Sequence, residues 1–300
     1  MRGVPKENRP DQVMMTCFFV SDLHGQIARY EKLFIAIQRE KPKAVFLGGD
    51  LLPFGATGIS FGELSANNFI QEYMEPKFQS LRQILDDSYP QVYMILGNDD
   101  PRSYEKYLVE GEVNRLWKYI HFQRTELGGF PIFGYAYVPP TPFMLKDWER
   151  YDVSRYVEPG CISPEEGWRS VQVATQEVKF ATIWGDLNCL VGDNDLSKSV
   201  FLFHTPPYQS ILDRAALDGQ HIDHVPLDVH VGSIAVKRFI EERQPLLTLH
   251  GHIHEAPRLT GNWKEKIGRT LACTAAHAGP ELSLVRFDLL ALDKISRELI

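Results

Sequence analysis

The sequence predicts an α/β protein in which short buried strands alternate with helices. Three apolar runs, residues 13–20, 44–47 and 91–96, are short and almost unbroken, which is typical of strands buried on both faces of a sheet. Residues 26–40 carry apolar side chains at helical spacing, and a second helical stretch, roughly 65–87, precedes the third strand. This order favours parallel strands with helices on the faces of the sheet.

The second half of the chain continues the pattern less regularly. Gly232 and Ser233 are expected to begin the helix I-A-V-K-R-F-I-E-E-R. Further strands are predicted as several short ones within 116–136, then buried ones at 199–203 and 245–249, and two closing strands at 269–276 and 282–290. The residues by themselves therefore indicate one largely parallel sheet.

The domain organisation follows from length and composition. The chain has 300 residues, of which 44% are hydrophobic, enough for one large domain or two small ones. Residues 1–12 are polar and are expected to be flexible, and residues 13–300 are expected to form a single domain with an insertion around 137–198. Within the insertion, residues 137–163 are rich in proline, aromatic and charged residues, and about 164–183 are predicted to be helical.

We expect the 137–170 segment to shape substrate access, because long loops of this kind are often lids or binding loops. Shortening it should then change substrate selectivity more than stability. The alternative is a clamp over the sheet or a dimer contact.

Composition excludes several classes of protein. The formal net charge of -7 argues against a protein that coats nucleic acid, because that footprint is basic. The four cysteines form no CxxC pair, so neither a disulfide framework nor a thiolate zinc site is expected. The N-terminus has no apolar signal region and no stretch reaches roughly 18 apolar residues. We therefore expect a cytoplasmic protein without membrane contact.

Polar residues follow five of the predicted strands in the motifs S-D-L-H, G-G-D, G-N-D-D, H-T-P-P and G-H-I-H. In an open sheet, ligands bind outside the carboxyl ends of the strands. Carboxylates, imidazoles and an amide, without thiolates, are typical ligands of borderline divalent ions. Any one of these motifs is commonly a turn, a helix cap or a buried core histidine, but the ordered set predicts a metal centre. Its candidate ligands are Asp22, His24, Asp50, Asn98, His204, His252 and His254.

This motif set resembles the signature of the calcineurin-like metallophosphoesterases, which reads D-x-H, G-D, G-N-H-D/E, a lone H and G-H-x-H. The resemblance spans about residues 15–285. It implies a four-layer αββα sandwich of two mixed β-sheets flanked by helices, in place of a single sheet. It also implies hydrolysis of phosphoester bonds, with phosphodiesters favoured, by a hydroxide that two metal ions activate.

The resemblance also implies how the residues divide between the two ions. Asp50 would bridge both ions. The first ion would take Asp22, His24 and His254, and the second Asn98, His204 and His252. Manganese is the expected metal, with iron, zinc, nickel or magnesium as alternatives. Asn98 and Asp99 are the residues predicted to be catalytic.

The sequence departs from the family pattern at Asp99, where most members carry a histidine that assists the leaving group. Beside two cations this carboxylate should be ionised, and its charge should disfavour dianionic monoesters relative to monoanionic diesters. The alternative is that it turns away and binds backbone amides of its own turn. Asp100 precedes Pro101, so it is predicted to be structural, with its side chain capping a helix that begins at the proline.

Two other functions remain open at this stage. One is a protein-interaction module on a phosphoesterase scaffold with weak or no catalysis, and the other is a nuclease. His221, His224 and His230 cluster in the loop after H-T-P-P, and His230 is the candidate for substrate binding, with solvated loop residues as the alternative. His250 is expected to be structural or to orient a metal-binding imidazole. The expected partner is a small phosphorylated substrate.

Overall fold

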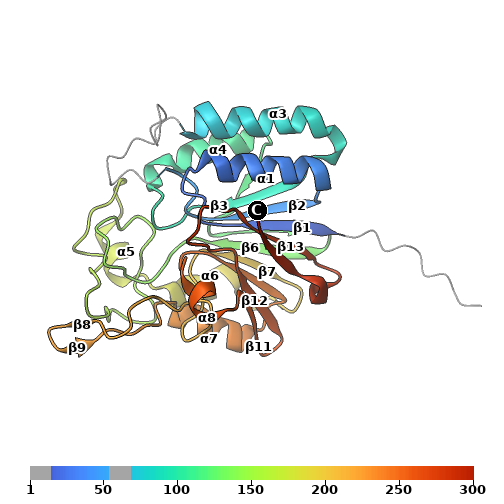
Figure 1. The fold of residues 1–300 in the computed structure, drawn as a ribbon. Coiled ribbons are helices and arrows are strands. Elements are labelled where there is room, and N and C mark those ends of the chain that lie inside the picture. The colour runs from blue at the N-terminus through green and yellow to red at the C-terminus, as the bar shows by residue number, and fades with distance from the viewer. Residues whose placement is uncertain (1–14, 54–68) are drawn as a thin grey trace, which may run out of the picture.

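Two six-stranded mixed sheets pack together with helices on their outer sides in the computed structural model, which describes residues 15–53 and 69–300 (Figure 1). This arrangement confirms the expected αββα sandwich. Three expectations lie wholly or partly outside the described residues: the flexible segment 1–12, the first residues of the strand at 13–20, and the start of the helical stretch at 65–87.

The first sheet has the strand order β14-β13-β1-β2-β3-β4. Its strands β1, β2 and β3 are parallel to one another, as predicted, and β13 is antiparallel to β1. The bounds are β1 Thr16–Val20, β2 Ala44–Gly48, β3 Gln91–Ile95, β4 Lys118–Tyr119, β13 Ser283–Asp288 and β14 Ser296–Leu299. The helices α1 (Ile27–Glu40), α3 (Glu75–Leu85) and α4 (Glu105–Val113) cover its outer side (Figure 1).

The second sheet has the order β11-β12-β10-β7-β6-β5. The bounds are β5 Gln123–Leu127, β6 Phe130–Tyr135, β7 Val200–Phe203, β10 Leu247–His250, β11 Lys264–Ile267 and β12 Thr270–Thr274. The helices α6 (Ile183–Val191) and α7 (Ile234–Arg243) pack together on its outer side. Ser233 caps α7 as expected, because its hydroxyl accepts a hydrogen bond from the N–H of Val236 at 3.0 Å.

The interpretation as a single sheet was wrong, because β12 and β13 lie in different sheets. The central strands of both sheets are buried and apolar, so a local pattern cannot assign such a strand to one sheet or the other. Contacts between distant residues decide this. The hydroxyl of Tyr93 in β3, for example, donates to the carbonyl of Glu126 in β5 at 3.0 Å and so joins the two sheets.

The remaining short elements lie in the connections. They are η2 (Phe69–Met74), η3 (Asp86–Ser88), η4 (Arg102–Tyr104), η5 (Leu292–Lys294), α5 (Thr175–Phe180), α8 (Ala256–Thr260) and the hairpin of β8 (His221–Ile222) and β9 (Val225–Pro226). The helix expected over 164–183 forms only from residue 175 onward. Trp168 instead pairs with residues 144–146. The N–H of Lys146 donates to the carbonyl of Trp168 at 2.8 Å, and the N–H of Trp168 donates to the carbonyl of Met144 at 2.9 Å, so these backbone groups are not available to a helix.

The 137–170 segment is packed into the protein. Lys146, Trp148 and Glu149 are all buried. Asp152 accepts hydrogen bonds from the N–H groups of Ile234 and Ala235 at the start of α7. These contacts fit the alternative of a clamp, and the effect of shortening the segment on selectivity and stability stays a prediction.

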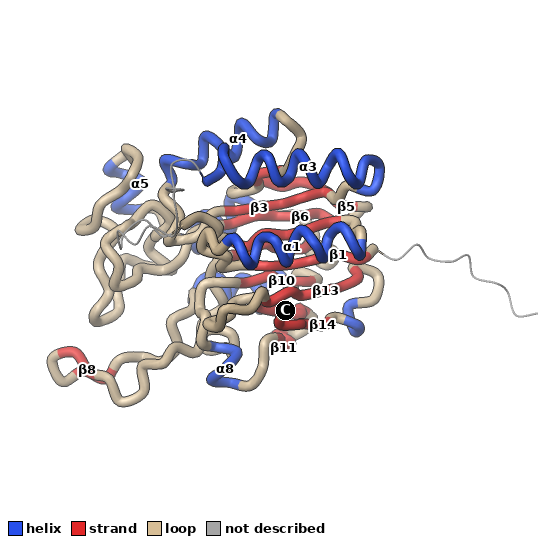
Figure 2. Tube along the Cα trace, turned by 45° about the horizontal axis from the view of Figure 1, so that its top comes forward, coloured by secondary structure: helices blue, strands red, loops and turns tan. Residues whose placement is uncertain are grey.

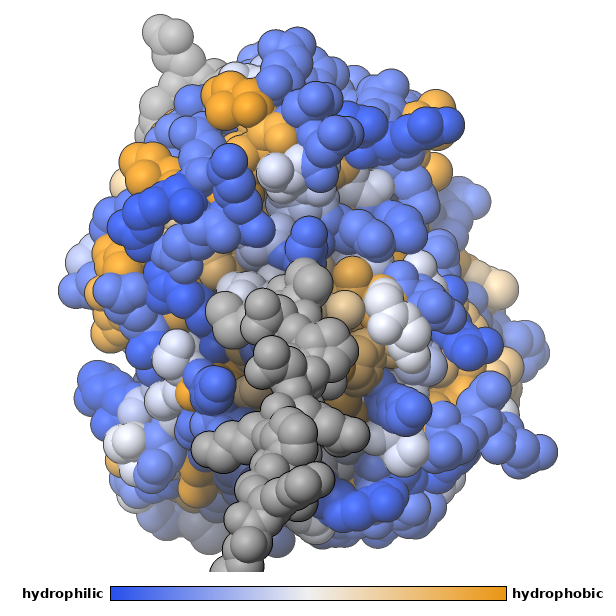
Figure 3. Space-filling model, turned by 90° about the vertical axis from the view of Figure 1, so that its right-hand side faces the viewer, coloured by the Kyte–Doolittle hydropathy of each residue, from blue (hydrophilic) through white to orange (hydrophobic). Residues whose placement is uncertain are grey.

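Loops gather at the end of the sheets where the parallel strands finish, on the left in Figure 2. Where described residues are visible at the opposite end of the molecule, the surface is mainly hydrophilic, with apolar residues in small separate groups (Figure 3). Among the helices in the described ranges, none is both long and apolar enough to cross a lipid bilayer.

Candidate metal centre

The seven candidate ligands come together at the loop-bearing end of the sheets. They form two groups, in each of which one donor atom per residue lies within 4.8 Å of all the others. The groups are Asp22, His24, Asp50 and His254, and Asp50, His204 and His252. Asn98 joins the second group, because its side-chain Oδ1 lies 3.0 Å from Nε2 of His204. Asp50 is the residue that the two groups share, as expected of a bridging ligand.

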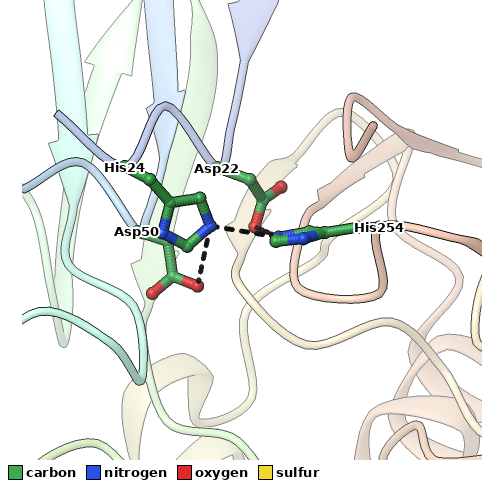
Figure 4. A group of neighbouring side chains, drawn as sticks. All are labelled: Asp22, His24, Asp50 and His254. Atoms are coloured by element: carbon green, nitrogen blue, oxygen red, sulfur yellow. Dashed lines mark hydrogen bonds and ion pairs between the residues drawn. The ribbon is translucent and has the colours of Figure 1, made fainter. Parts of the chain in front are cut away.

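The first group brings side chains of both sheets to one point. Nε2 of His24 and Nε2 of His254 lie 3.1 Å apart, and Nε2 of His254 lies 3.3 Å from Oδ1 of Asp22. Figure 4 shows these rings and carboxylates pointing toward one another, with Asp50 below His24. Two imidazole nitrogens converging with carboxylate oxygens form a donor set that suits a divalent cation.

The second group is built around His204, which is fully buried. Its Nδ1 lies 2.8 Å from the carbonyl of Gly48, and a hydrogen bond there leaves Nε2 free as a ligand. Nε2 lies 3.3 Å from Oδ2 of Asp50, and the same oxygen lies 3.9 Å from Nε2 of His24. Oδ2 of Asp50 therefore lies between the two groups.

Several candidate ligands adopt a left-handed backbone conformation that non-glycine residues rarely adopt. The φ angles are 57° for Asp22, 46° for His24, 51° for Asp50 and 72° for His252. Backbone bonds hold two of these turns in place: the N–H of Asp22 donates to Gly49, and that of His24 to Asp50. Such conformations cost roughly 1–3 kcal/mol each and cluster at functional sites. They also let Asp22 and His24, two residues apart, reach the same point.

Two glycines make room for the centre. A Cβ at Gly97 would clash with Oδ1 of Asp50 and lie 2.7 Å from the ring of His204. A Cβ at Gly49 would lie 2.6 Å from Nδ1 of His204. The turns after β2 and β3 can approach His204 this closely only because they carry no side chain at these positions.

The electrostatics of the metal-free site indicate a place for positive charge. Within the described residues, the carboxylates of Asp22 and Asp50 are buried and their ion pairs are with histidines alone. Burial opposes ionisation of Asp50, but His204 and His24 outweigh it and lower the pKa of Asp50 to about 2. Burial likewise opposes the charge on His204, but Asp50 raises the pKa of His204 to about 10. A protonated imidazole thus supplies the charge that divalent ions would bring, so the residues present fit such ions.

A model of the calcineurin-like phosphoesterase family matches residues 15–256. The chain belongs to this family. A comparison with curated proteins found no match.

Solved structures share the fold of this calcineurin-like phosphoesterase. One crystal structure is 16% identical and covers 96% of this chain and 99% of its own, with a TM-score of 0.59. The protein TT1561 of Thermus thermophilus is 18% identical, with the same coverage of both chains and a TM-score of 0.54. An archaeal phosphodiesterase, 10% identical over 95% of this chain and 100% of its own, has a TM-score of 0.41, which is too low to inform function. At these identities the likeness concerns the fold alone.

Asp99, the residue at which this family member departs from the signature, faces the centre. Its Oδ2 lies 3.8 Å from Nδ1 of His24, and its Oδ1 accepts a hydrogen bond from the side-chain amide of Asn98 at 2.9 Å. The bond to Asn98 turns the amide oxygen of Asn98 toward His204. The structure thus contradicts the alternative in which Asp99 binds only backbone amides of its own turn. Without metal, burial and the carboxylates of Asp50 and Asp100 raise the pKa of Asp99 to about 8, so its ionisation depends on bound cations.

Asp100 is structural, but not as a helix cap. Its buried carboxylate accepts hydrogen bonds from the N–H groups of Leu51, Leu52 and Gly97 at 2.8–3.0 Å. The helical segment after Pro101 starts as η4, and Pro101 precedes its first residue. The N–H groups of Leu51 and Leu52, after β2, are buried and need an acceptor. This requirement places the carboxylate of Asp100 beside them.

Four further histidines belong to neither of the two ligand groups found among the described residues: His221, His224, His230 and His250. Nδ1 of His230 lies 2.7 Å from Asp213, and its ring packs edge-on against Tyr208, so its role in substrate binding stays a prediction. His221 and His224 are exposed around the hairpin of β8 and β9. His250 is buried between the carbonyl of Thr205 and the hydroxyl of Thr248, both at 2.8 Å, consistent with the structural role expected for it.

Arg29 is a residue of the site that the sequence analysis did not identify. It lies in α1 and is only 5% exposed. Its guanidinium donates to the carbonyl of Asp22 at 2.6 Å and to the carbonyl of Gly279. The signal in the sequence is a charged residue next to Tyr30, on the side of the predicted helix that becomes buried. Arg29 fixes the backbone of Asp22 in its left-handed conformation.

Proposed function

We propose that the protein is a metal-dependent phosphoesterase that uses two divalent ions to hydrolyse small phosphodiesters, with manganese as the expected metal. The observation that carries this proposal is the position of Oδ2 of Asp50 between two groups of candidate ligands, 3.3 Å from His204 and 3.9 Å from His24. Two ions bound there would supply a water of lowered pKa and positive charge for the phosphoryl oxygens.

The side chains of the chain have distinct tasks in this scheme. Asp50 holds its carboxylate between the groups, and the N–H of Asp99 fixes it by donating to Oδ1 at 2.9 Å. Asn98 offers a neutral oxygen. The substrate is expected to approach from the more exposed side, where the side chains of His254 and Asp99 are 33% and 22% exposed, whereas His204 is fully buried.

The preference for diesters rests on Asp99. Its carboxylate lies on the exposed side of the centre, where a substrate phosphate would meet it. A monoester carries more negative charge than a diester at neutral pH and is repelled more strongly. A histidine, with a reference pKa near 6.5, could also donate a proton to the leaving group, which an ionised carboxylate cannot.

Two other functions remain as outcomes of the test. A nuclease acts on the same type of bond, but the net charge of -7 disfavours a nucleic-acid substrate. A protein-interaction module would not need the full ligand set, and all seven positions are filled and brought together. The small phosphorylated substrate and the cytoplasmic location stay predictions from the sequence.

The test combines metal content with a substrate comparison. The chain is stripped with a chelator, and manganese is added while binding stoichiometry and melting temperature are measured. Hydrolysis of matched aryl phosphodiesters and phosphomonoesters, and of a short oligonucleotide, is then compared. We expect two bound ions, a raised melting temperature and the fastest turnover on the small diester. Binding without any hydrolysis would support the interaction module, and fastest cleavage of the oligonucleotide would support the nuclease.

A further inference from the structure

The turn at residues 97–101 carries Asn98 and Asp99 but belongs to no helix or strand. Its position must therefore come from contacts with the rest of the protein. On one side the turn is tied to β2, because Asp100 accepts from Leu51 and Leu52. These bonds connect it to the first sheet, from which it also emerges. They do not by themselves fix its distance from His204, which follows β7 of the second sheet and meets the first sheet at the carbonyl of Gly48.

The inserted segment supplies the contacts on the other side. The indole N–H of Trp148 donates to the backbone carbonyl of Asp100 at 2.8 Å. The carboxylate of Asp147, the preceding residue, accepts from the N–H of Arg102 at 2.8 Å. A third bond runs from the N–H of Ser103 to the hydroxyl of Ser170 at 2.9 Å.

These anchors are themselves rigidly placed. Trp148 is fully buried, and its ring lies edge-on against His121 with centroids 4.8 Å apart. It also contacts Tyr137, just after β6 of the second sheet, and the guanidinium of Arg102 lies 5.2 Å from its centroid. The carboxylate of Asp147 is only 2% exposed and also accepts from the N–H of Ser170. The segment thus connects the second sheet to the turn that follows β3.

We propose that Trp148 and Asp147 are positioning residues for the Asn98 half of the metal centre. They set where Asn98 lies relative to His204, and the 3.0 Å between Oδ1 of Asn98 and Nε2 of His204 depends on that placement. The other half, formed by Asp22, His24 and His254, is held by the turns after β1 and β10, so it does not depend on the insertion. Mutation of a group that supports a metal ligand typically lowers metal affinity by roughly 10–100-fold. Because the insertion contacts the Asn98 half, this loss of affinity should fall on one of the two ions.

This inference rests on the proposed metal centre, and its test is manganese binding to the metal-free chain by calorimetry. Trp148→Phe removes the N–H and keeps an aromatic ring. We expect it to weaken one manganese equivalent about tenfold and to leave the other unchanged. Trp168→Phe is the matched control, because Trp168 belongs to the same segment and is 51% exposed. Trp168→Phe should match the wild type in its affinity for both manganese equivalents and in melting temperature.

A double variant separates positioning from a general loss of stability. If Trp148 acts through Asn98, Asn98→Ala combined with Trp148→Phe should bind the weakened equivalent no worse than Asn98→Ala alone. If Trp148→Phe does not fold, Asp147→Asn is judged by the same criteria. Unchanged binding, equal weakening of both equivalents, or additive losses in the double variant would overturn the inference. A wild type that binds no manganese would instead overturn the proposed function, together with everything that rests on it.

Discussion

The imidazole of His204 lies 3.3 Å from the carboxylate of Asp50, although the two residues follow strands of different sheets. His204 comes directly after β7, and Asp50 follows β2. The candidate centre therefore exists only where the ends of the two sheets meet. Its geometry depends on how the sheets pack and on the turns that reach across from one to the other.

Asp50→Asn should lose at least one bound metal and nearly all turnover. Asp50 is the one candidate ligand among the described residues that belongs to both groups, and the amide lacks the charge that screens two cations from each other. Metal content and hydrolysis of an aryl diester are measured together. Asp193→Asn, at an exposed position, is the control. If Asp50→Asn keeps two tightly bound metals and the wild-type rate, the ligand assignment is wrong.

Asp99→His should raise monoester turnover relative to diester turnover. An extra unit of substrate charge about 5 Å from the carboxylate would cost roughly 3 kcal/mol at an effective dielectric constant near 20, before screening. A third of that, about 1 kcal/mol, would change the ratio about fivefold, since about 1.4 kcal/mol is a factor of ten. The measurement compares the wild type with Asp99→His on matched aryl monoesters and diesters. An unchanged ratio with both metals bound would show that Asp99 has no electrostatic effect on substrate choice.

Arg29→Lys should destabilise the protein and weaken metal binding on the Asp22 side. A lysine ammonium lacks the planar fork with which Arg29 reaches the carbonyls of Asp22 and Gly279. Loss of one such bond to a buried carbonyl costs about 1–3 kcal/mol. Denaturant unfolding and manganese affinity report the two effects. Arg39→Lys, at an exposed position of the same helix, should change neither, and an equal effect of both substitutions would refute the role of Arg29.

His250 should make the stability of the metal-free chain depend on pH. Burial lowers the pKa of His250 to about 4, below the reference value near 6.5 that applies in the unfolded chain. Between these values the unfolded chain binds the extra proton, so the stabilisation is complete above pH 6.5 and is lost as the pH falls toward 4. Relative to His250→Phe, the wild type should lose about 2 kcal/mol of unfolding free energy between pH 7.5 and pH 5. A parallel pH dependence in both proteins would contradict a neutral buried imidazole.

The sequence by itself determined the chemistry of the candidate site. The motifs that carry Asp22, Asp50 and His204 are local: a short apolar run specifies a buried strand, and the polar residues after it must lie at the strand's end. Parallel strands bring such ends to one edge. The α/β class, the parallel order of β1, β2 and β3, the cap at Ser233 and the identity of the seven candidate ligands could therefore be predicted without tertiary information.

Only the tertiary structure decided which strand belongs to which sheet and what fixes the turns. The carboxylate of Asp100 lies where the N–H groups of Leu51 and Leu52 need an acceptor. The carbonyl of Asp100 accepts a hydrogen bond from Trp148. The guanidinium of Arg29 donates to the carbonyls of Asp22 and Gly279. These partners are mostly tens or hundreds of residues apart, and no local pattern encodes such pairs. Their geometry follows from the requirement that every buried polar group find a partner once the two sheets have packed, and that requirement acts only on the folded chain.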